Sequence, residues 1–169
     1  MITKDTDFGT LLASDISRLT TMEISALTQE QQEAFTAEHA SGLTSQLLGV
    51  LPTKYMPADA LKGISTTIIG SLSIKSLSAD QLSALSIDQM AALSPQQVSV
   101  ISKTQLAKIS SDSLEALSIG TKETAGGLSG LDVTLLSATQ LGYLTVDQIV
   151  ALSNSQFSKL IPAQLNGLN

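Results

Sequence analysis

The sequence has no cysteine, no tryptophan and a single histidine. Without cysteine the chain forms no disulfide bond, no thiolate metal site and no cysteine nucleophile. Aromatic residues make up only 3% of the chain, although hydrophobic residues make up 43%. The core must therefore be built from Leu, Ile, Val, Met and Ala. A length of 169 residues is enough for one domain of ordinary size.

Positive charge is also scarce, because 9 Lys and Arg residues stand against 15 Asp and Glu residues and leave a net charge of −6. Duplex recognition depends on basic side chains that neutralise phosphates, so we expect no nucleic-acid partner. No stretch reaches the roughly 18 to 20 apolar residues that cross a bilayer. The first residues, MITKDTDFGTLLASDISRL, lack the pattern of a signal peptide. The sequence therefore predicts no membrane insertion.

What the sequence does contain is an eight-residue repeat. It reads LSADQLSA, LSIDQMAA, LSPQQVSV, ISKTQLAK and ISSDSLEA across residues 77–116, and LSATQLGY, LTVDQIVA, LSNSQFSK and LIPAQLNG across residues 136–167. Counted from the leading residue, positions 1 and 6 are apolar, position 2 is usually Ser or Thr, and position 5 is usually Gln. A unit this small cannot bury its own apolar face, so the repeats must stack on their neighbours.

The same register extends over most of the chain, with position 1 recurring every eight residues from Leu11 to Leu168. The steps that differ are five residues long at 51–56 and 72–77 and eleven residues long at 117–128. Each departs from eight by three residues, about one tight turn, which indicates a turn removed from or added to a helical unit. The long step contains Gly126 and Gly127, so we expect a protruding loop near residues 118–127.

Short capped helices account for an octad better than other elements do. A strand would put positions 1 and 6 on opposite faces, and one continuous helix would drift by roughly 80° per repeat. Ser or Thr at position 2 is a good N-cap, and Gln at position 5 then lies at N3 and completes a capping box. Because isolated one-turn helices are unstable in water, positions 1 and 6 must form a shared core. We therefore expect an all-α solenoid of short capped helices.

The N-terminal part follows the pattern less closely. We expect residues 1–76 to form a degenerate capping segment and residues 77–169 a regular octapeptide-repeat solenoid, within one continuous domain. Between residues 28 and 52, Gln32 and Ala40 replace larger apolar residues at position 6. This stretch therefore predicts longer amphipathic helices as an alternative to separate short ones.

The last octad leaves Leu165 and Leu168 with no following unit in this sequence to cover them. Two explanations fit: the natural array continues, or this end pairs with another chain. We therefore expect a protein partner or self-association through exposed repeat ends.

No residue pattern specifies a site of chemistry. His39 has Glu33 and Glu38 nearby, but their spacing is poor for a metal site, and an exposed position on a helix explains the histidine better. The serines are explained as caps, because no GxSxG motif is present. Asp recurs in the first turn of the expected helices, where it complements the helix dipole, at Asp80, Asp88, Asp112 and Asp147. We predict no catalytic residue, no metal ligand, no cofactor and no enzymatic activity.

The units LSADQLSA, LSIDQMAA and LTVDQIVA resemble the L-[ST]-x-x-Q-[ILV]-x-[AL] octapeptide arrays of large bacterial secreted and surface proteins, including haemagglutinin-like and adhesin-like chains. This resemblance covers about residues 77–168 and implies a bacterial, exported and non-enzymatic protein, secreted or at the cell surface. We therefore expect a structural repeat module that acts as a rigid spacer or protein-interaction scaffold. The alternative is an effector or toxin-associated domain that binds one host or bacterial protein through its N-terminal segment and the eleven-residue unit.

Overall fold

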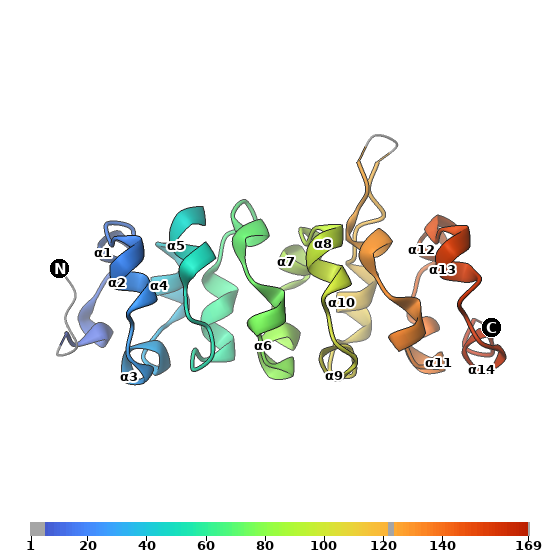
Figure 1. Cartoon of the computed structure of the whole chain (residues 1–169), viewed down its shortest axis with the longest axis horizontal. Helices are drawn as coiled ribbons and strands as arrows, with labels where there is room; N and C mark the ends of the chain where they lie inside the picture. Colours follow the sequence, from blue (N-terminus) through green and yellow to red (C-terminus); the bar gives the residue numbers. More distant parts are fainter. Residues whose placement is uncertain (1–5, 122–123, 169) are drawn as a thin grey trace. The chain divides into compact units, whose positions relative to one another are not determined.

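The chain consists of short helices joined by brief extended segments (Figure 1), as seen in a computed structural model that describes residues 6–121 and 124–168. Within these ranges there is no strand, and an isolated antiparallel bridge joins Gly120 to Ala125. The predicted all-α class is therefore confirmed. The chain divides into two compact units, Met1–Leu85 and Ser86–Asn169. One continuous domain with a division after residue 76 stays a prediction.

The first unit contains α-helices of four to six residues and short 3-10 helices, labelled η. They are η1 (Phe8–Thr10), α1 (Ala13–Ile16), α2 (Thr21–Ser25), α3 (Gln29–Glu33), α4 (Ala37–Ser41), α5 (Ser45–Val50), η2 (Ala58–Gly63), η3 (Ile69–Ser71), η4 (Ile74–Ser76) and α6 (Ala79–Ser83).

The second unit is built from the same kinds of element. They are α7 (Ile87–Ala91), α8 (Pro95–Ser99), α9 (Lys103–Leu106), α10 (Ser111–Glu115), η5 (Gly127–Gly130), η6 (Val133–Leu135), α11 (Ala138–Leu141), α12 (Val146–Ala151), α13 (Asn154–Phe157) and α14 (Pro162–Leu165).

The predicted capping boxes form at most of the α-helices. At α7 the Ser86 hydroxyl accepts the Gln89 backbone N–H at 3.2 Å, and the Gln89 side-chain oxygen accepts the Ser86 N–H at 2.9 Å. The same pairing recurs at Thr28 with Gln31, Ser78 with Gln81, Ser94 with Gln97, Ser102 with Gln105, Ser137 with Gln140, Thr145 with Gln148 and Ser153 with Gln156. Each Ser or Thr cap is worth about 1 kcal/mol relative to Ala.

The longer N-terminal helices considered for residues 28–52 are wrong. This stretch forms the separate helices α3, α4 and α5, and each begins after its own threonine cap. Gln32 is buried at position 6 because its amide is satisfied there: it donates to the Leu27 carbonyl at 3.0 Å and accepts the Tyr55 N–H at 3.4 Å. A polar residue at a core position therefore does not merge the short helices into a long one.

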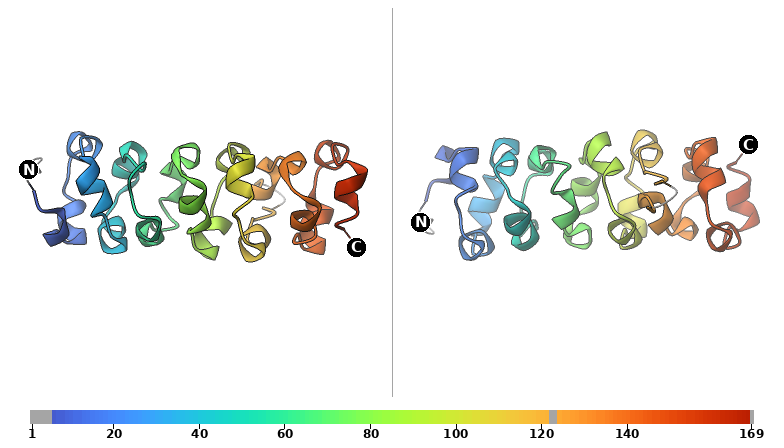
Figure 2. Two further views of the ribbon diagram at one scale, coloured as in Figure 1. Left: turned by 90° about the horizontal axis from the view of Figure 1, so that it is seen from below. Right: turned by 90° about the horizontal axis from the view of Figure 1, so that it is seen from above.

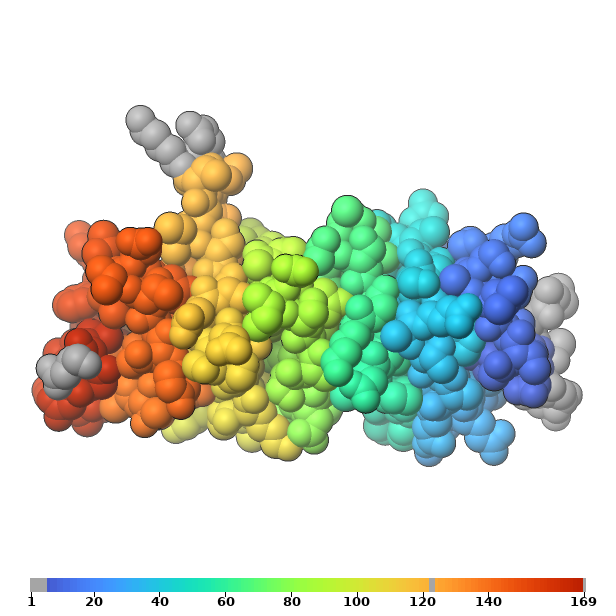
Figure 3. Space-filling model, turned by 180° about the vertical axis from the view of Figure 1, so that it is seen from behind, coloured from blue at the N-terminus to red at the C-terminus, as the bar shows by residue number. Residues whose placement is uncertain are grey.

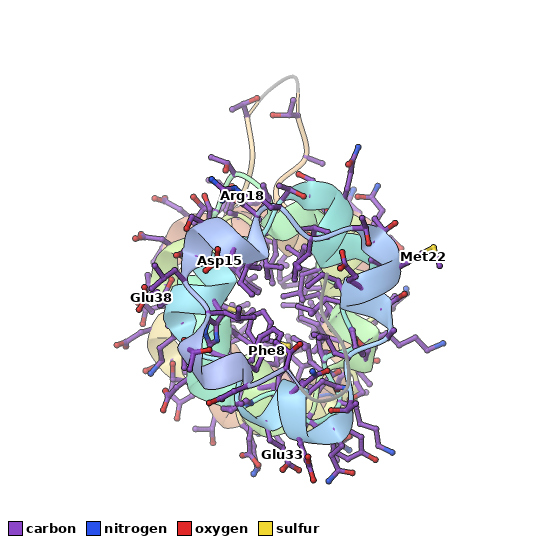
Figure 4. The ribbon with its side chains drawn as sticks, turned by 90° about the vertical axis from the view of Figure 1, so that its left-hand side faces the viewer. Phe8, Asp15, Arg18, Met22, Glu33 and Glu38 are labelled. Atoms are coloured by element: carbon purple, nitrogen blue, oxygen red, sulfur yellow. The ribbon has the colours of Figure 1, made fainter. Side chains whose placement is uncertain are left out.

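Positions 1 and 6 form the core of each unit, as the register predicts. In the first unit Ile16, Ile24 and Leu82 at position 6 are fully buried, and Phe35 at position 1 is nearly so. The view in Figure 4 shows Phe8 pointing into the centre of the coil, whereas other labelled side chains point away from it, namely Arg18, Met22, Glu33 and Glu38. The residues at positions 1 and 6 of each helix thus lie on the inner side of the coil.

Helices three octads apart lie side by side, which defines the coil. In the first unit α1 packs on α4 and α2 on α5, and in the second unit α7 packs on α10 and α11 on α14. Both views of Figure 2 show the chain of each unit winding in this way. In the regular stretches one coil therefore contains three octads, and each octad forms one of the three sides of the coil.

One of the five-residue steps is made by a 3-10 helix, as the three-residue difference indicates. The step at 72–77 contains η4, and the turn at η6 has the same form, with Leu131 buried where the octad register expects no core residue. In the eleven-residue step the described residues on either side of 122–123 pair with each other: the Thr121 N–H donates to the Thr124 carbonyl at 2.8 Å, and Gly120 forms an antiparallel bridge with Ala125. Gly120 has a φ of +83°, which favours glycine. The described part of this segment projects from the surface in Figure 3.

Candidate functional site

The glutamine at position 5 makes two kinds of contact, and the second joins one coil to the next. Its side-chain oxygen closes the capping box of its own helix, while its Nε2 group donates to backbone carbonyls of the preceding coil. Gln148 accepts the Thr145 N–H at 3.0 Å and donates to the carbonyls of Leu114, Glu115 and Leu117 at 2.9–3.0 Å. A single buried amide therefore caps one helix and ties it to the coil before it.

The hydrogen bond from the glutamine Nε2 to a carbonyl of an earlier coil recurs at other position-5 glutamines. Gln81 donates to the carbonyls of Thr53 and Met56, at 2.6 and 2.8 Å. In the second unit the same bonds run from Gln140 to Leu106, from Gln156 to Leu128 and Leu131, and from Gln164 to Val133 and Leu136. The octad pattern predicts the cap but not this second bond, because the bond depends on which octads are adjacent.

His39 takes the place of this glutamine in α4. The ring is 3% exposed, so the expected surface position is wrong. Its Nδ1 atom accepts the Thr36 N–H at 3.0 Å, and its Nε2 atom lies 2.9 Å from the carbonyl of Leu11, 28 residues earlier. These partners require a neutral ring with its proton on Nε2. The ring also contacts Phe8 and Phe35, with centroids 5.2 and 5.4 Å away.

The first coil uses carboxylates at position 5 instead. Asp15 accepts the Leu12 N–H at 3.0 Å, and Glu23 accepts the Thr20 N–H at 2.9 Å. A carboxylate closes the cap as well as an amide does, but it has no N–H to donate to another coil. The carboxylates of Asp15 and Glu23 therefore close their caps but cannot supply the N–H donor that the glutamines direct at an earlier coil.

The other acidic candidates take structural places. Asp80, Asp88, Asp112 and Asp147 all lie in the first turn of their helices, as the helix-dipole interpretation predicts. Glu33 accepts a bond from the Gln29 side chain at 2.8 Å. Within residues 6–121 and 124–168, no three His, Asp or Glu side chains are grouped so that they could hold a metal ion.

Two exposed contacts shift the pKa of their charged groups in the first unit. The Lys62 ammonium, 2.6 Å from the Asp59 carboxylate, lowers the pKa of Asp59 through a hydrogen bond and its charge. The side chain of Tyr55 raises the pKa of Lys54, whose nitrogen lies 4.8 Å from the centre of the tyrosine ring. Both pairs lie in solvent, where ion pairs add little to stability.

A shallow cavity of about 420 Å³ lies on the surface of the second unit between α9, η6 and α11. Lys103, Thr134, Gln140 and Tyr143 contribute to its walls. The amide of Gln140 is already bonded to Ser137 and Leu106. This cavity therefore presents an ordinary mixed surface between neighbouring sides of the coil.

The last described coil has a face that differs from its counterparts. Its position-6 side chains Phe157 and Leu165 are 47% and 38% exposed, and Ile149 is half-buried. We name these three residues the end face. The earlier position-6 side chains of this unit are at most 1% exposed, because the next coil covers them, and those described are Met90, Val98, Leu106, Leu114, Val133 and Leu141.

Comparison with protein families, with curated proteins and with solved structures yields no match to this chain. Among the described residues, no helix is long and apolar enough to span a bilayer. The interpretation of function therefore depends on the geometry of the coils.

Proposed function

We propose that this chain is a structural repeat module that serves as a rigid spacer or protein-interaction scaffold. The observation that carries the proposal is the double use of the position-5 amide. In Gln148, Gln156 and Gln164 each buried amide is bonded both to its own helix cap and to the preceding coil. Buried polar groups that are fully bonded in this way resist both separation and sliding of neighbouring coils.

The outward positions of the repeat supply the surface for contacts. On α12, Val146 and Val150 are 76% and 78% exposed and lie one helical turn apart. Repeat proteins bind partners through such ordered rows of exposed side chains. We place the module in a secreted or surface protein of a bacterium, because of the resemblance of its octads to the arrays of such proteins, and that resemblance also supports a non-enzymatic role.

Distance measurements within the second unit test the rigid spacer. Because the chain has no cysteine, Thr104→Cys and Asn154→Cys place two unique spin labels on exposed residues of different coils. We expect one narrow distance distribution that persists in mild denaturant. A control pair on one coil, Asn154→Cys with Ala163→Cys, gives the width due to the labels alone. A much broader distribution for the first pair would rule out a rigid spacer.

The projecting segment favours a second candidate function, that of an effector or toxin-associated domain. Ile119 is 48% exposed on this segment. Deletion of residues 119–125, which joins Ser118 to Gly126, should leave thermal unfolding unchanged, because Leu117 and Leu128 stay in the core. A host or bacterial protein that binds the full chain but not this variant would support the second function.

A further inference from the structure

His39 makes the two contacts of a position-5 glutamine with a ring that can take up a proton. Its Nδ1 atom accepts the Thr36 N–H at 3.0 Å, and its Nε2 group donates to the Leu11 carbonyl at 2.9 Å. The second bond matches that of Gln164, whose amide donates to the Leu136 carbonyl, also 28 residues earlier, at 2.8 Å. An amide stays neutral at physiological pH, whereas an imidazole ordinarily changes its charge between pH 5 and 8. A titratable group therefore joins α4 to the start of α1.

A proton added to this ring finds no acceptor in the folded chain. It binds at Nδ1, where the Thr36 N–H already points, so two donors then face each other. The ring is 3% exposed and contacts Phe35 and Phe8, which points into the centre of the coil (Figure 4). Water therefore cannot accept the new N–H. A buried donor without an acceptor is unfavourable, as is a buried charge without a counter-ion, so the folded first unit requires the neutral ring.

In the described part of the chain, no carboxylate forms an ion pair with the ring. Asp15 is linked to it only indirectly: its carboxylate accepts the Leu12 N–H at 3.0 Å, and the carbonyl of the same peptide group accepts the His39 Nε2 group. The other charged residues on the surrounding elements η1, α1, α3, α4 and η2 and at their ends are exposed to solvent, and they are Asp7, Arg18, Glu30, Glu33, Glu38, Asp59 and Lys62. The folded state thus offers no ion-pair partner for a protonated ring.

We propose that His39 is an acid-sensitive joint, at which protonation of the ring opens the contact between α4 and the first coil. The opened chain binds a proton that the closed chain excludes. The joint is therefore most stable where the ring is neutral in both states, and it loses stability as the pH falls. This regulation goes beyond the spacer function. It is confined to the first unit, because His39 is the only histidine in the sequence.

Amide hydrogen exchange on the full chain tests this joint, because two cap bonds of equal length can be compared. The Thr36 N–H donates to His39 at 3.0 Å, and the Thr145 N–H donates to Gln148 at the same distance in the second unit. The protection factor corrects for the intrinsic pH dependence of exchange. Between pH 7.5 and 5.0 we expect the factor of Thr36 to fall by about tenfold or more, since one excluded proton lowers the closing equilibrium by up to about tenfold per pH unit. That of Thr145 should stay constant.

His39→Gln is the matched control, because glutamine makes both bonds at the other caps and does not titrate in this range. In this variant the protection of Thr36 should be the same at both pH values. Constant protection of Thr36 in the native chain would overturn the proposal. Equal losses at Thr36 and Thr145 would overturn it too, because they would indicate general unfolding in acid.

An NMR titration of the ring protons follows the proton itself, and the single histidine makes their assignment unambiguous. A ring that gains its proton while Thr36 stays protected would also contradict the proposal. If His39→Gln does not fold, the comparison of Thr36 with Thr145 in the native chain still decides the matter. The spin labels lie in the second unit, so a failure here is distinct from a failure of the spacer.

Discussion

At the scale of single residues, the amide at position 5 connects local structure to packing. Neutral hydrogen bonds add only about 1 kcal/mol each, but a buried donor or acceptor left without a partner costs about 1–3 kcal/mol. The capping oxygen and the donating nitrogen belong to one side chain, so a single substitution can separate their effects. Gln148 is the best place to do so, because its nitrogen lies within 3.0 Å of three carbonyls.

Gln148→Glu should keep the cap at Thr145 and lose the contact with the preceding coil. We expect a loss of about 1–3 kcal/mol or more in the free energy of unfolding at pH 7, because an acceptor replaces the donor in a buried place. Urea titration followed by circular dichroism measures this. Gln96→Glu is the matched control, since Gln96 is exposed on α8, and it should change stability by no more than about 0.5 kcal/mol. Equal effects of the two variants would contradict the role of the amide.

The stability of the Gln148→Glu variant should also depend on pH. Burial beside carbonyl oxygens raises the pKa of the introduced carboxyl above about 4.3, its usual value in an unfolded chain. Below about pH 4 the carboxyl is protonated in both states and can donate as the amide does, so the deficit relative to the native protein is small there. The deficit grows as the pH rises through 4.3 towards the folded-state pKa. Urea titrations of both proteins across this range test the sign, and a deficit independent of pH would contradict it.

Two substitutions of His39 separate the contribution of its hydrogen bonds to stability from the contribution of its ring contacts. His39→Gln keeps both hydrogen bonds and loses the packing on Phe8 and Phe35, worth about 0.5–1.5 kcal/mol. His39→Phe keeps an aromatic ring but leaves the Thr36 N–H and the Leu11 carbonyl without this partner. We expect the phenylalanine variant to be the less stable of the two by at least about 1 kcal/mol, as measured by chemical denaturation. The opposite order would mean that aromatic packing decides the choice of histidine.

At the scale of elements, one side of the coil requires very close approach between backbones. A Cβ atom added at Gly63, at the end of η2, would lie 1.8 Å from the Ala37 carbonyl oxygen at the start of α4. The same contact recurs between Gly42 and Ala13, where the distance would be 2.0 Å. Small residues late in the octad are therefore required where they meet the first turn of a helix in the preceding coil.

Gly63→Ala should destabilise the first unit by about 1–3 kcal/mol, because the neighbouring backbone has to move. The matched control is Gly49→Ala in α5, where an added Cβ meets nothing within 4 Å. That change should stabilise the protein by about 0.5–1 kcal/mol, through the better helix propensity of alanine. Thermal unfolding of the two variants should thus give shifts of opposite sign. Shifts of the same sign would show that backbone packing does not limit this side.

Much of this architecture could be predicted from the residues. The octad predicts the cap and the burial of positions 1 and 6, and these depend only on neighbours within one octad. Gln32 misled the prediction of helix length, because its satisfied amide behaves as a core residue. The burial of His39 and the second bond of the glutamines could not be predicted, since both depend on the number of octads in a coil. The same octad pattern is compatible with different numbers of octads in a coil, so the sequence does not specify that number.

At the scale of the whole molecule, a period of three octads should govern which insertions the chain accepts. In the second unit η5 packs on α8, and a Cβ atom added at Gly130 would lie 1.9 Å from the Pro95 carbonyl oxygen. The backbone near Gly130 therefore requires α8, which begins at Pro95, as its neighbour. An insertion of 24 residues, which is three octads, again places a copy of α8 next to η5. An insertion of 8 residues places α9 next to η5 instead.

Duplication of residues 93–116 directly after Ala116 should therefore fold and increase the denaturant dependence of unfolding, because one more coil buries its surface. Duplication of residues 109–116 alone should lower the free energy of unfolding below that of the native chain, since Lys103 at the start of α9 replaces Pro95 beneath Gly130. Urea unfolding curves of the two variants distinguish these outcomes. If the single octad were accepted as readily as the full coil, each octad would stack independently of its side, and the coil of three would not be the unit of stability.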